Sequence, residues 1–230
     1  MKFKTKKIKQ DPALIGKVSF AQAILSMLTG RECDVGELEF FEVLLVAGMD
    51  NGIEAPSVFV PRVVASTGNS INTALAAGVL AIGDYHGGAI EACVNYLNSG
   101  KDASAIVGEV LAKNERMPGY GHKIYKDADP RVTAIYQVAE KVGKMGKFMK
   151  LAREIEKELA SQSGKKLPLN IDGAIAGVMC ELGLDARYGK AIFALSRLPN
   201  MARHVIEELD NDKPYRRLEE SDVTRDSIEK

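Results

Sequence analysis

Apolar residues recur at intervals of three and four positions over most of this chain, whereas the strict alternation of a half-buried strand is scarce. Such intervals place side chains on one face of a helix. Phe20, Ile24 and Leu28 share one such face. Gly30 then follows as a helix stop. Because no strand–helix–strand unit and no internal repeat stands out, the sequence predicts an all-α fold.

Two of the expected helices begin with a specific signal. Asp34 and Glu37 have the spacing of a capping box. Asp129 followed by Pro130 is typical of an N-cap and a first helical residue. Helices are expected at residues 18–29, 34–49, 71–82, 87–97, 102–112, 129–142, 148–160, 173–182 and 200–209, with one more starting at Asp185.

Glycine-containing loops are expected at residues 143–146 and 161–166, and a hinge near them would divide the chain. On this basis we expect a large lobe from residues 1–100 and 170–217, a small lobe from residues 101–169, and a charged tail at 218–230.

The chain has 31 Lys+Arg and 31 Asp+Glu residues, so its net charge is zero. This composition does not indicate binding to nucleic acid or to an anionic membrane. The hydrophobic content of 46% is too high for a disordered chain.

Cys33, Cys93 and Cys180 are widely spaced and form no CxxC pair, which indicates buried, reduced thiols in a cytoplasmic protein. Neither a signal peptide nor an apolar run long enough to span a bilayer is expected.

His86 lies in a glycine-rich junction, residues 83–88, directly before an expected helix. Glycine at such a point lets the backbone come close to a ligand. The positive end of the helix dipole favours a neutral imidazole, which can donate one hydrogen bond without carrying charge. The competing interpretation is a loop histidine whose ring is bound only by backbone groups.

A second candidate cluster runs from His122 to Arg131 and contains an acid–base group, two lysines and an arginine within ten residues. Arg131 falls in the first turn of its helix, where the helix dipole disfavours a cation. A cation at that place indicates a bound anion, most naturally a carboxylate held by the planar guanidinium. A solvated charged loop is the alternative.

Asp172 is a carboxylate between apolar residues at an expected helix start. It can be an N-cap, or, if buried, a general base or acid. We find no GxGxxG, Walker A or GxSxG sequence. No histidine pair has the spacing of a metal site, so no metal is expected.

Together these segments resemble citrate synthases and citryl-CoA lyases. The similarity is carried by Gly121-His122 leading to Asp129-Pro130-Arg131, by His86-Gly87-Gly88-Ala89, by Asn170-Ile171-Asp172-Gly173, by Ser196-Arg197 with His204, and by Lys213-Pro214-Tyr215-Arg216-Arg217. Their order and spacing agree from about Phe20 to Arg217, and the resemblance implies the helical fold of that family.

The resemblance also implies the roles of individual residues. His122 would remove the proton of a tertiary hydroxyl, His86 would donate to a thioester enolate oxygen, and Asp172 would protonate the enolate carbon. The implied carboxylate ligands are Arg131, Arg197, Arg216 and Asn51. The implied coenzyme A contacts are Gly119, Tyr120, Gly121, Lys126 and Lys166. The coenzyme A thioester is expected as substrate, with no permanently bound cofactor.

Two departures from the family pattern guide the choice of reaction. The chain is expected to lack the long helical N-terminal portion of full-length synthases, as in citryl-CoA lyase or the lyase module of ATP-citrate lyase. Asn51 replaces a substrate-contacting histidine. We therefore expect a lyase that cleaves citryl-CoA to acetyl-CoA and oxaloacetate. The alternatives are a short citrate or 2-methylcitrate synthase, and a CoA-binding subunit that needs a partner chain.

The same resemblance predicts a homodimer or a multiple of one, in which Arg216 completes a neighbouring subunit's site. The small-residue helix at 71–82 suits close packing against a second copy, or plain core packing. A citryl-CoA synthetase is a further candidate partner.

Overall fold

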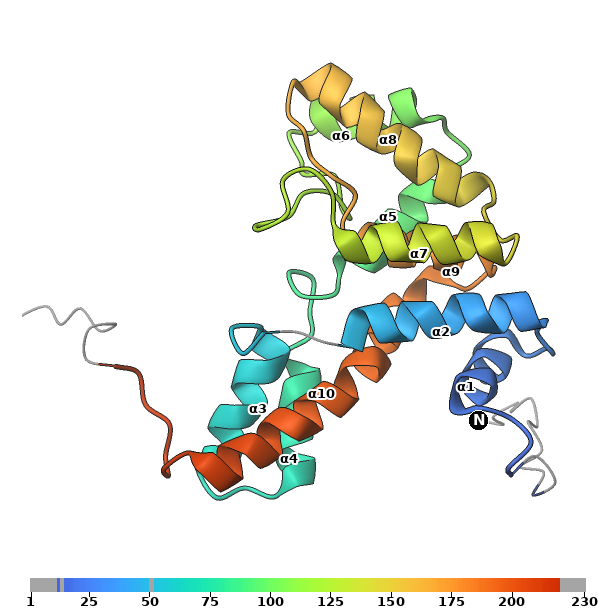
Figure 1. Cartoon of the computed structure of the whole chain (residues 1–230). Coiled ribbons are helices and arrows are strands. Elements are labelled where there is room, and N and C mark those ends of the chain that lie inside the picture. The colour runs from blue at the N-terminus through green and yellow to red at the C-terminus, as the bar shows by residue number, and fades with distance from the viewer. Residues whose placement is uncertain (1–11, 13–14, 50–51, 220–230) are drawn as a thin grey trace, which may run out of the picture. The chain divides into compact units, whose positions relative to one another are not determined.

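The computed structural model describes residue 12, residues 15–49 and residues 52–219. Within those residues every regular element is helical, and β-structure is limited to isolated bridges (Figure 1). The prediction of an all-α fold is confirmed. The elements are α1 (Phe20–Thr29), α2 (Val35–Met49), α3 (Pro56–Ser66), α4 (Ile71–Leu80), α5 (Ala89–Leu97), α6 (Ala103–Ala112), α7 (Pro130–Lys141), α8 (Lys147–Ser163), α9 (Ile171–Glu181), the 3-10 helix η2 (Ala186–Tyr188) and α10 (Gly189–Asn211).

Both predicted helix starts are present. Asp34 Oδ1 accepts from Glu37 N at 2.8 Å, and Glu37 Oε2 accepts from Asp34 N at 3.0 Å, which completes the capping box of α2. Asp129 caps α7 by accepting from Arg131 N at 3.0 Å, with Pro130 as first helical residue. These signals depend on neighbours in sequence, so they can be identified without the fold.

The sequence did not predict α3, and it predicted a separate helix at 200–209 that is part of α10. Pro61 lies inside α3 and Pro199 inside α10. An interior proline removes a helical hydrogen bond and usually marks a helix end. Tertiary packing overrides this cost in α3, where Pro61, Val58 and Ala65 are all buried.

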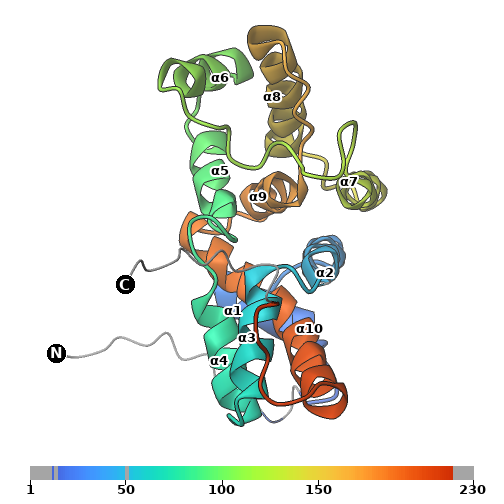
Figure 2. The same cartoon turned by 90° about the vertical axis from the view of Figure 1, so that its left-hand side faces the viewer.

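Two compact units divide the chain, one drawn from residues 1–50 and 83–196, the other from residues 51–82 and 197–230. The lobe boundaries expected from the sequence lie elsewhere and stay a prediction. Helix α9 is the most buried helix of the first unit, with contacts to α2, α5, α7 and α8 (Figure 2). Its small residues, including Gly173 and Gly177, allow neighbours to approach closely.

In the second unit α3 packs on α4, and Ala65, Ala74 and Val205 form a buried cluster with α10. A Cβ at Gly78 would lie 3.1 Å from Met201 Sδ and from Pro61 Cγ. Ala74 and Gly78, the buried small residues of α4, therefore serve core packing within the chain. No described helix has both the length and the apolar character that crossing a membrane requires.

Two of the three cysteines are buried as expected. Cys93 and Cys180 lie in the interior of the first unit, whereas Cys33 is only partly buried. Burial raises the pKa of the Cys180 thiol to about 12. None of the described cysteines forms a disulfide.

Candidate active site

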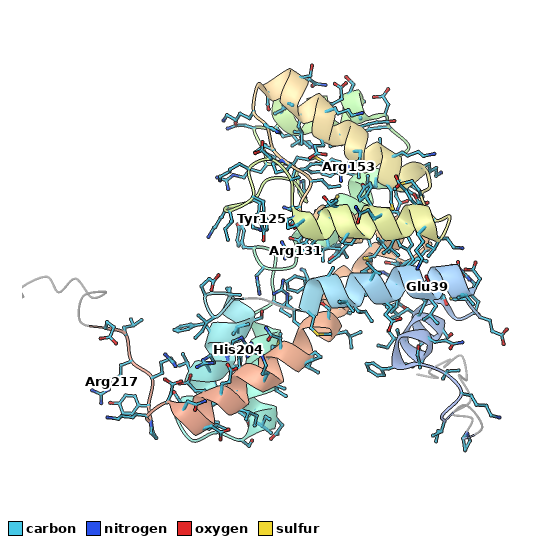
Figure 3. All side chains as sticks on the ribbon, in the orientation of Figure 1. Glu39, Tyr125, Arg131, Arg153, His204 and Arg217 are labelled. Atoms are coloured by element: carbon cyan, nitrogen blue, oxygen red, sulfur yellow. The ribbon has the colours of Figure 1, made fainter. Side chains whose placement is uncertain are left out.

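His122 lies on the irregular segment before α7, and backbone groups orient its ring. Its Nδ1 faces the N–H groups of Ile124 at 3.0 Å and Tyr125 at 3.1 Å. Because both groups are donors, Nδ1 must be the acceptor, and the proton of the neutral ring lies on Nε2. That Nε2 is 3.4 Å from Arg131 Nη2. Figure 3 shows Tyr125 and Arg131 at the start of α7, where this arrangement is built.

Arg131 is fixed by the residue that caps its helix. Its Nε and Nη2 donate to the two oxygens of Asp129 at 3.0 and 2.7 Å. Asp129 is 1% exposed, so its carboxylate is a buried anchor. The hydrogen bonds that Arg131 donates to Asp129, together with the charges of Asp129, Tyr125 and Asp172, raise the pKa of Arg131. The sequence identified Asp129 only as a cap, and its hold on the Arg131 side chain was missed.

Asp172 is the second residue of α9, and the cap of that helix is Asn170. The Asn170 Oδ1 accepts from the N–H groups of Asp172 at 3.0 Å and Gly173 at 3.3 Å. The N-cap interpretation of Asp172 is therefore wrong. Asn170 Nδ2 also donates to Gly121 O at 2.9 Å, which ties the start of α9 to the segment that carries His122.

The two segments lie side by side because of close backbone contact. Asn170 N donates to Gly119 O at 3.0 Å, and Gly121 N donates to Pro168 O at 2.7 Å. A Cβ at Gly119 would lie only 2.7 Å from Gly173 Cα, and Gly119 has a φ of +85°. Both features require glycine at this position. His122 and Asp172 are thereby brought to one place in the first unit.

His86 sits on a tight turn that ends at α5. Gly83 and His86 exchange backbone hydrogen bonds of 3.0 and 2.9 Å. The imidazole packs edge-on against Phe193, with ring centroids 5.3 Å apart. At Gly87, whose φ is +93°, a Cβ would lie 2.8 Å from Phe193 Cδ1. The sequence did not identify Phe193, which reaches the turn from α10, more than 100 residues further along the chain.

Helix α5 links the His86 turn to the rest of the site. It packs against α9, and its Cys93 lies near Gly119 and within range of the Asp172 charge. Burial, with smaller contributions from the charges of Cys180 and Asp172, raises the pKa of the Cys93 thiol. His86, His122, Arg131 and Asp172 thus all belong to elements of one compact unit.

A model of the family described as citrate synthase, C-terminal domain, matches residues 1–218 of the chain. The chain belongs to the citrate synthase family. Citrate synthase 2 of Bacillus subtilis is 31% identical over 203 residues, which are 85% of this chain and 54% of that protein. The chain spans about half the length of the curated relatives it matches.

Among solved structures, citryl-CoA lyase from Hydrogenobacter thermophilus is 42% identical, with a TM-score of 0.90. The match covers 95% of this chain and 88% of the lyase. ATP citrate lyase from Methanothrix soehngenii, solved with citrate and coenzyme A, shares the fold at 22% identity and a TM-score of 0.82. That match covers 94% of this chain and 38% of the larger protein.

The residues that the citrate synthase pattern assigns to coenzyme A surround the His122 segment. Lys126 Nζ donates to His122 O at 3.1 Å, and Lys166 Nζ pairs with Asp127 at 2.6 Å. Gly121, like Gly119, has a φ of +85°. The Tyr120 hydroxyl is buried and donates to Ala152 O at 2.8 Å, so its side chain anchors the segment to α8. Their role in binding coenzyme A stays a prediction.

The arginines that the family pattern assigns to carboxylates fall in both units. Arg131 belongs to the first, whereas Arg197 and Arg216 belong to the second. Arg197 lies on α10 and is 5% exposed. Arg216 follows α10 and forms a two-point ion pair with Glu208. Asn51 lies outside the described residues.

Arg62 and Glu208 are buried charged residues that the sequence analysis missed. Arg62 Nε lies 2.8 Å from Glu208 Oε2, and Arg62 Nη1 donates to His204 O at 3.3 Å. Figure 3 places His204 on α10, beside α3. Arg62 went unnoticed because it is carried by α3, which was not expected to be a helix. A single arginine among valines gives no other signal in the sequence.

Proposed function

We propose that this protein is a citryl-CoA lyase, which cleaves citryl-CoA to acetyl-CoA and oxaloacetate through a thioester enolate. The observation that carries the proposal is the arrangement around His122. Its Nε2 lies beside the Arg131 guanidinium, on a segment bonded directly to the helix start that bears Asp172. This reaction requires two acid–base groups and a cation that binds a substrate carboxylate. His122 and Asp172 would be the acid–base groups, and Arg131 would be the cation.

Each residue has a defined task in the proposed cleavage. Cleavage starts from the state in which Asp172 carries a proton and His122 Nε2 carries none, so Nε2 accepts the tertiary hydroxyl proton as the carbon–carbon bond breaks. In the reverse direction, the Nε2–H donor returns it to the new alkoxide, and the Arg131 cation compensates the charge left on the ring. The electron pair of the broken bond becomes the thioester enolate, whose oxygen receives a hydrogen bond from His86. Asp172 then protonates the enolate carbon, giving acetyl-CoA.

Stabilisation of the enolate decides whether Asp172 can work in both directions. A free aspartate has a pKa of about 3.9, far below that of a carbon next to a thioester. The enolate must therefore be stabilised by the site, at about 3–4 kcal/mol for one well-placed donor. His86 fits this task because its turn, its glycines and the Phe193 contact hold the ring in place.

Similarity to the lyase supports cleavage over synthesis. The chain matches 88% of the Hydrogenobacter thermophilus citryl-CoA lyase, whereas it spans about half of the curated synthases. A synthase must also hydrolyse the citryl-CoA thioester, which needs a closed site that positions water. We propose that this site cleaves the carbon–carbon bond and hydrolyses the thioester poorly.

The product formed from citryl-CoA tests the proposal. Oxaloacetate is followed through a malate dehydrogenase couple, and free coenzyme A through a colorimetric thiol reagent. A lyase yields oxaloacetate and acetyl-CoA faster than citrate and free thiol. If citrate and free thiol are the main products, the protein is a short citrate or 2-methylcitrate synthase. The similarity to citrate synthases is the observation that supports this alternative.

A CoA-binding subunit is the second alternative, favoured by Asn51 in place of a histidine. An asparagine amide can donate to a carboxylate but carries no charge. If coenzyme A binds and no product forms until another chain is added, this alternative replaces the lyase.

We also propose a homodimer or a multiple of one, working in the cytoplasm, with citryl-CoA synthetase as a candidate partner. Apolar side chains of α4 remain exposed, among them Ile71, Val79 and Leu80 at 40%, 40% and 84%. A second copy would cover such a surface. Light scattering that shows a fully active monomer would contradict the dimer.

A further inference from the structure

Glu208 is a carboxylate buried between two guanidinium groups of the second unit. Its side chain has no exposed surface. Arg62 Nε lies 2.8 Å away, while Arg216 Nε and Nη2 donate at 2.9 and 2.6 Å. A buried carboxylate is tolerated only when it is paired and hydrogen-bonded. Asp212 lies within 3.0 Å of Arg62 Nη2 and 3.1 Å of Arg216 Nη2, so the two arginines face two carboxylates, of which only Glu208 is fully buried.

Arg216 lies on the irregular segment after α10, and a small set of contacts fixes it. Its N–H donates to Ser66 Oγ at 2.9 Å, and Glu208 grips the Nε–Nη2 edge of its side chain. Without these contacts the long side chain would sample many rotamers. Glu208 therefore decides where the guanidinium points.

The opposite end of the same guanidinium is left accessible. The Arg216 side chain is 25% exposed, although its partner Glu208 is fully buried. No hydrogen bond reaches Nη1 within the part of the chain that the structure describes. Asp212, whose side chain is 40% exposed, is the other acid at this end, at 3.1 Å from Nη2. Arginine has five donors, so it can hold two carboxylates at once.

We propose that Glu208 is a positioning residue for Arg216, and that Asp212 is an internal stand-in for the substrate carboxylate that Arg216 binds. Glu208 holds the Nε–Nη2 edge permanently. The Nη1–Nη2 end exchanges Asp212, which is partly exposed and stays paired with Arg62, for a carboxylate of the substrate. This inference rests on the proposed function, because it takes a carboxylate of oxaloacetate or citryl-CoA as the ligand of Arg216.

The two carboxylates then have opposite effects on binding. Removing the Glu208 charge loosens Arg216 and weakens binding of a dicarboxylate. Removing the Asp212 charge takes away a competitor and strengthens binding. A purely structural role for the network predicts the same direction for both changes, since each loses an ion pair to Arg62 and Arg216.

Calorimetric titration of the full chain with oxaloacetate measures these effects. We expect Glu208→Gln to weaken the affinity about tenfold, and Asp212→Asn to strengthen it about two- to threefold. Glu207→Gln is the matched control, because Glu207 is the neighbouring acid and pairs with Arg62 and Arg203 but has no described bond to Arg216. Its affinity for oxaloacetate should be unchanged. Thermal unfolding of each variant shows that it is folded.

A double substitution separates positioning from general damage. In an Arg216→Ala background, Glu208→Gln should cause no further loss of affinity. The inference is overturned if the two losses multiply, if Asp212→Asn weakens binding, or if the wild-type chain does not bind oxaloacetate. Failure of the proposed function gives a different result. In that case oxaloacetate binds with the expected variant pattern, but citryl-CoA yields no oxaloacetate.

Discussion

The segment that carries His122 and the network around Glu208 fix their side chains in different ways. His122 and Asn170 are held by backbone groups that lie two or three residues away, or on a directly paired segment. Arg216 and Glu208 are held by charged side chains, one of which, Arg62, comes from a helix about 150 residues earlier. Backbone donors carry little charge and need no counter-ion, whereas a buried ion pair depends on every member being present.

The comparison predicts that damage at the first region reduces activity, and damage at the second also reduces stability. Four substitutions test this difference, in order of expected effect.

His122→Ala should lower kcat about a hundred- to ten-thousand-fold, the contribution of a positioned acid–base group. Adding Asp172→Ala should cost far less than a second loss of that size, because the two groups act in one reaction. Initial rates of oxaloacetate formation measure both. Lys123→Ala, an exposed change on the same segment, is the control. A His122→Ala enzyme within tenfold of wild type would refute the assigned role.

Arg62→Met should lower the free energy of unfolding by about 3–5 kcal/mol, since it removes one cation from a fully buried carboxylate. Urea unfolding followed by circular dichroism gives this value. Arg187→Met is the comparison, because the Arg187–Asp185 pair is exposed and its loss should hardly move the unfolding curve. Equal shifts for the two variants would mean that burial of Glu208 is unimportant.

Gly119→Ala should lower the free energy of unfolding by about 1–3 kcal/mol and also reduce kcat. The new Cβ has an unfavourable φ and meets Gly173, so the His122 segment must move away from α9. Gly143→Ala has a φ of +67° but no atom within 4 Å of its Cβ. It therefore isolates backbone strain. If both variants lose the same stability and neither loses activity, the close contact does not position His122.

Lys166→Ala should raise KM for citryl-CoA about two- to tenfold without shifting the thermal midpoint. Its pair with Asp127 is exposed, so the structural contribution is small, while a phosphate of coenzyme A would lose a charged donor. Lys101→Ala removes a comparable exposed lysine that pairs with Glu109. Equal effects on KM would remove Lys166 from the proposed coenzyme A contacts.

Local signals in the sequence predicted much of the first unit. The capping pairs Asp34–Glu37 and Asp129–Pro130 lie within four residues, and helix periodicity needs only a short window. The assignment of Asp172 as a possible cap was wrong because Asn170 competes for the same N–H groups. Two polar residues at one helix start cannot be ranked without the backbone.

Residues that act through distant partners could not be predicted. Phe193 packs on the His86 ring from α10. Arg62 pairs with Glu208 from α3, whose interior proline argued against a helix there. Nothing in the sequence on either side of these two residues indicates which residue each one contacts. Only the fold brings them together, because such contacts depend on long-range packing.

The sequence by itself determined the helical class, most helix starts and the family resemblance, and it supplied the candidate catalytic residues. Periodicity, capping and motif spacing are properties of neighbouring residues, so a linear chain displays them. The tertiary structure alone decided which backbone groups orient His122, why Gly119 must be glycine, and which acid holds Arg216. Those outcomes depend on close approach and burial between distant segments, where a contact of a few ångströms decides whether a buried charge is stable.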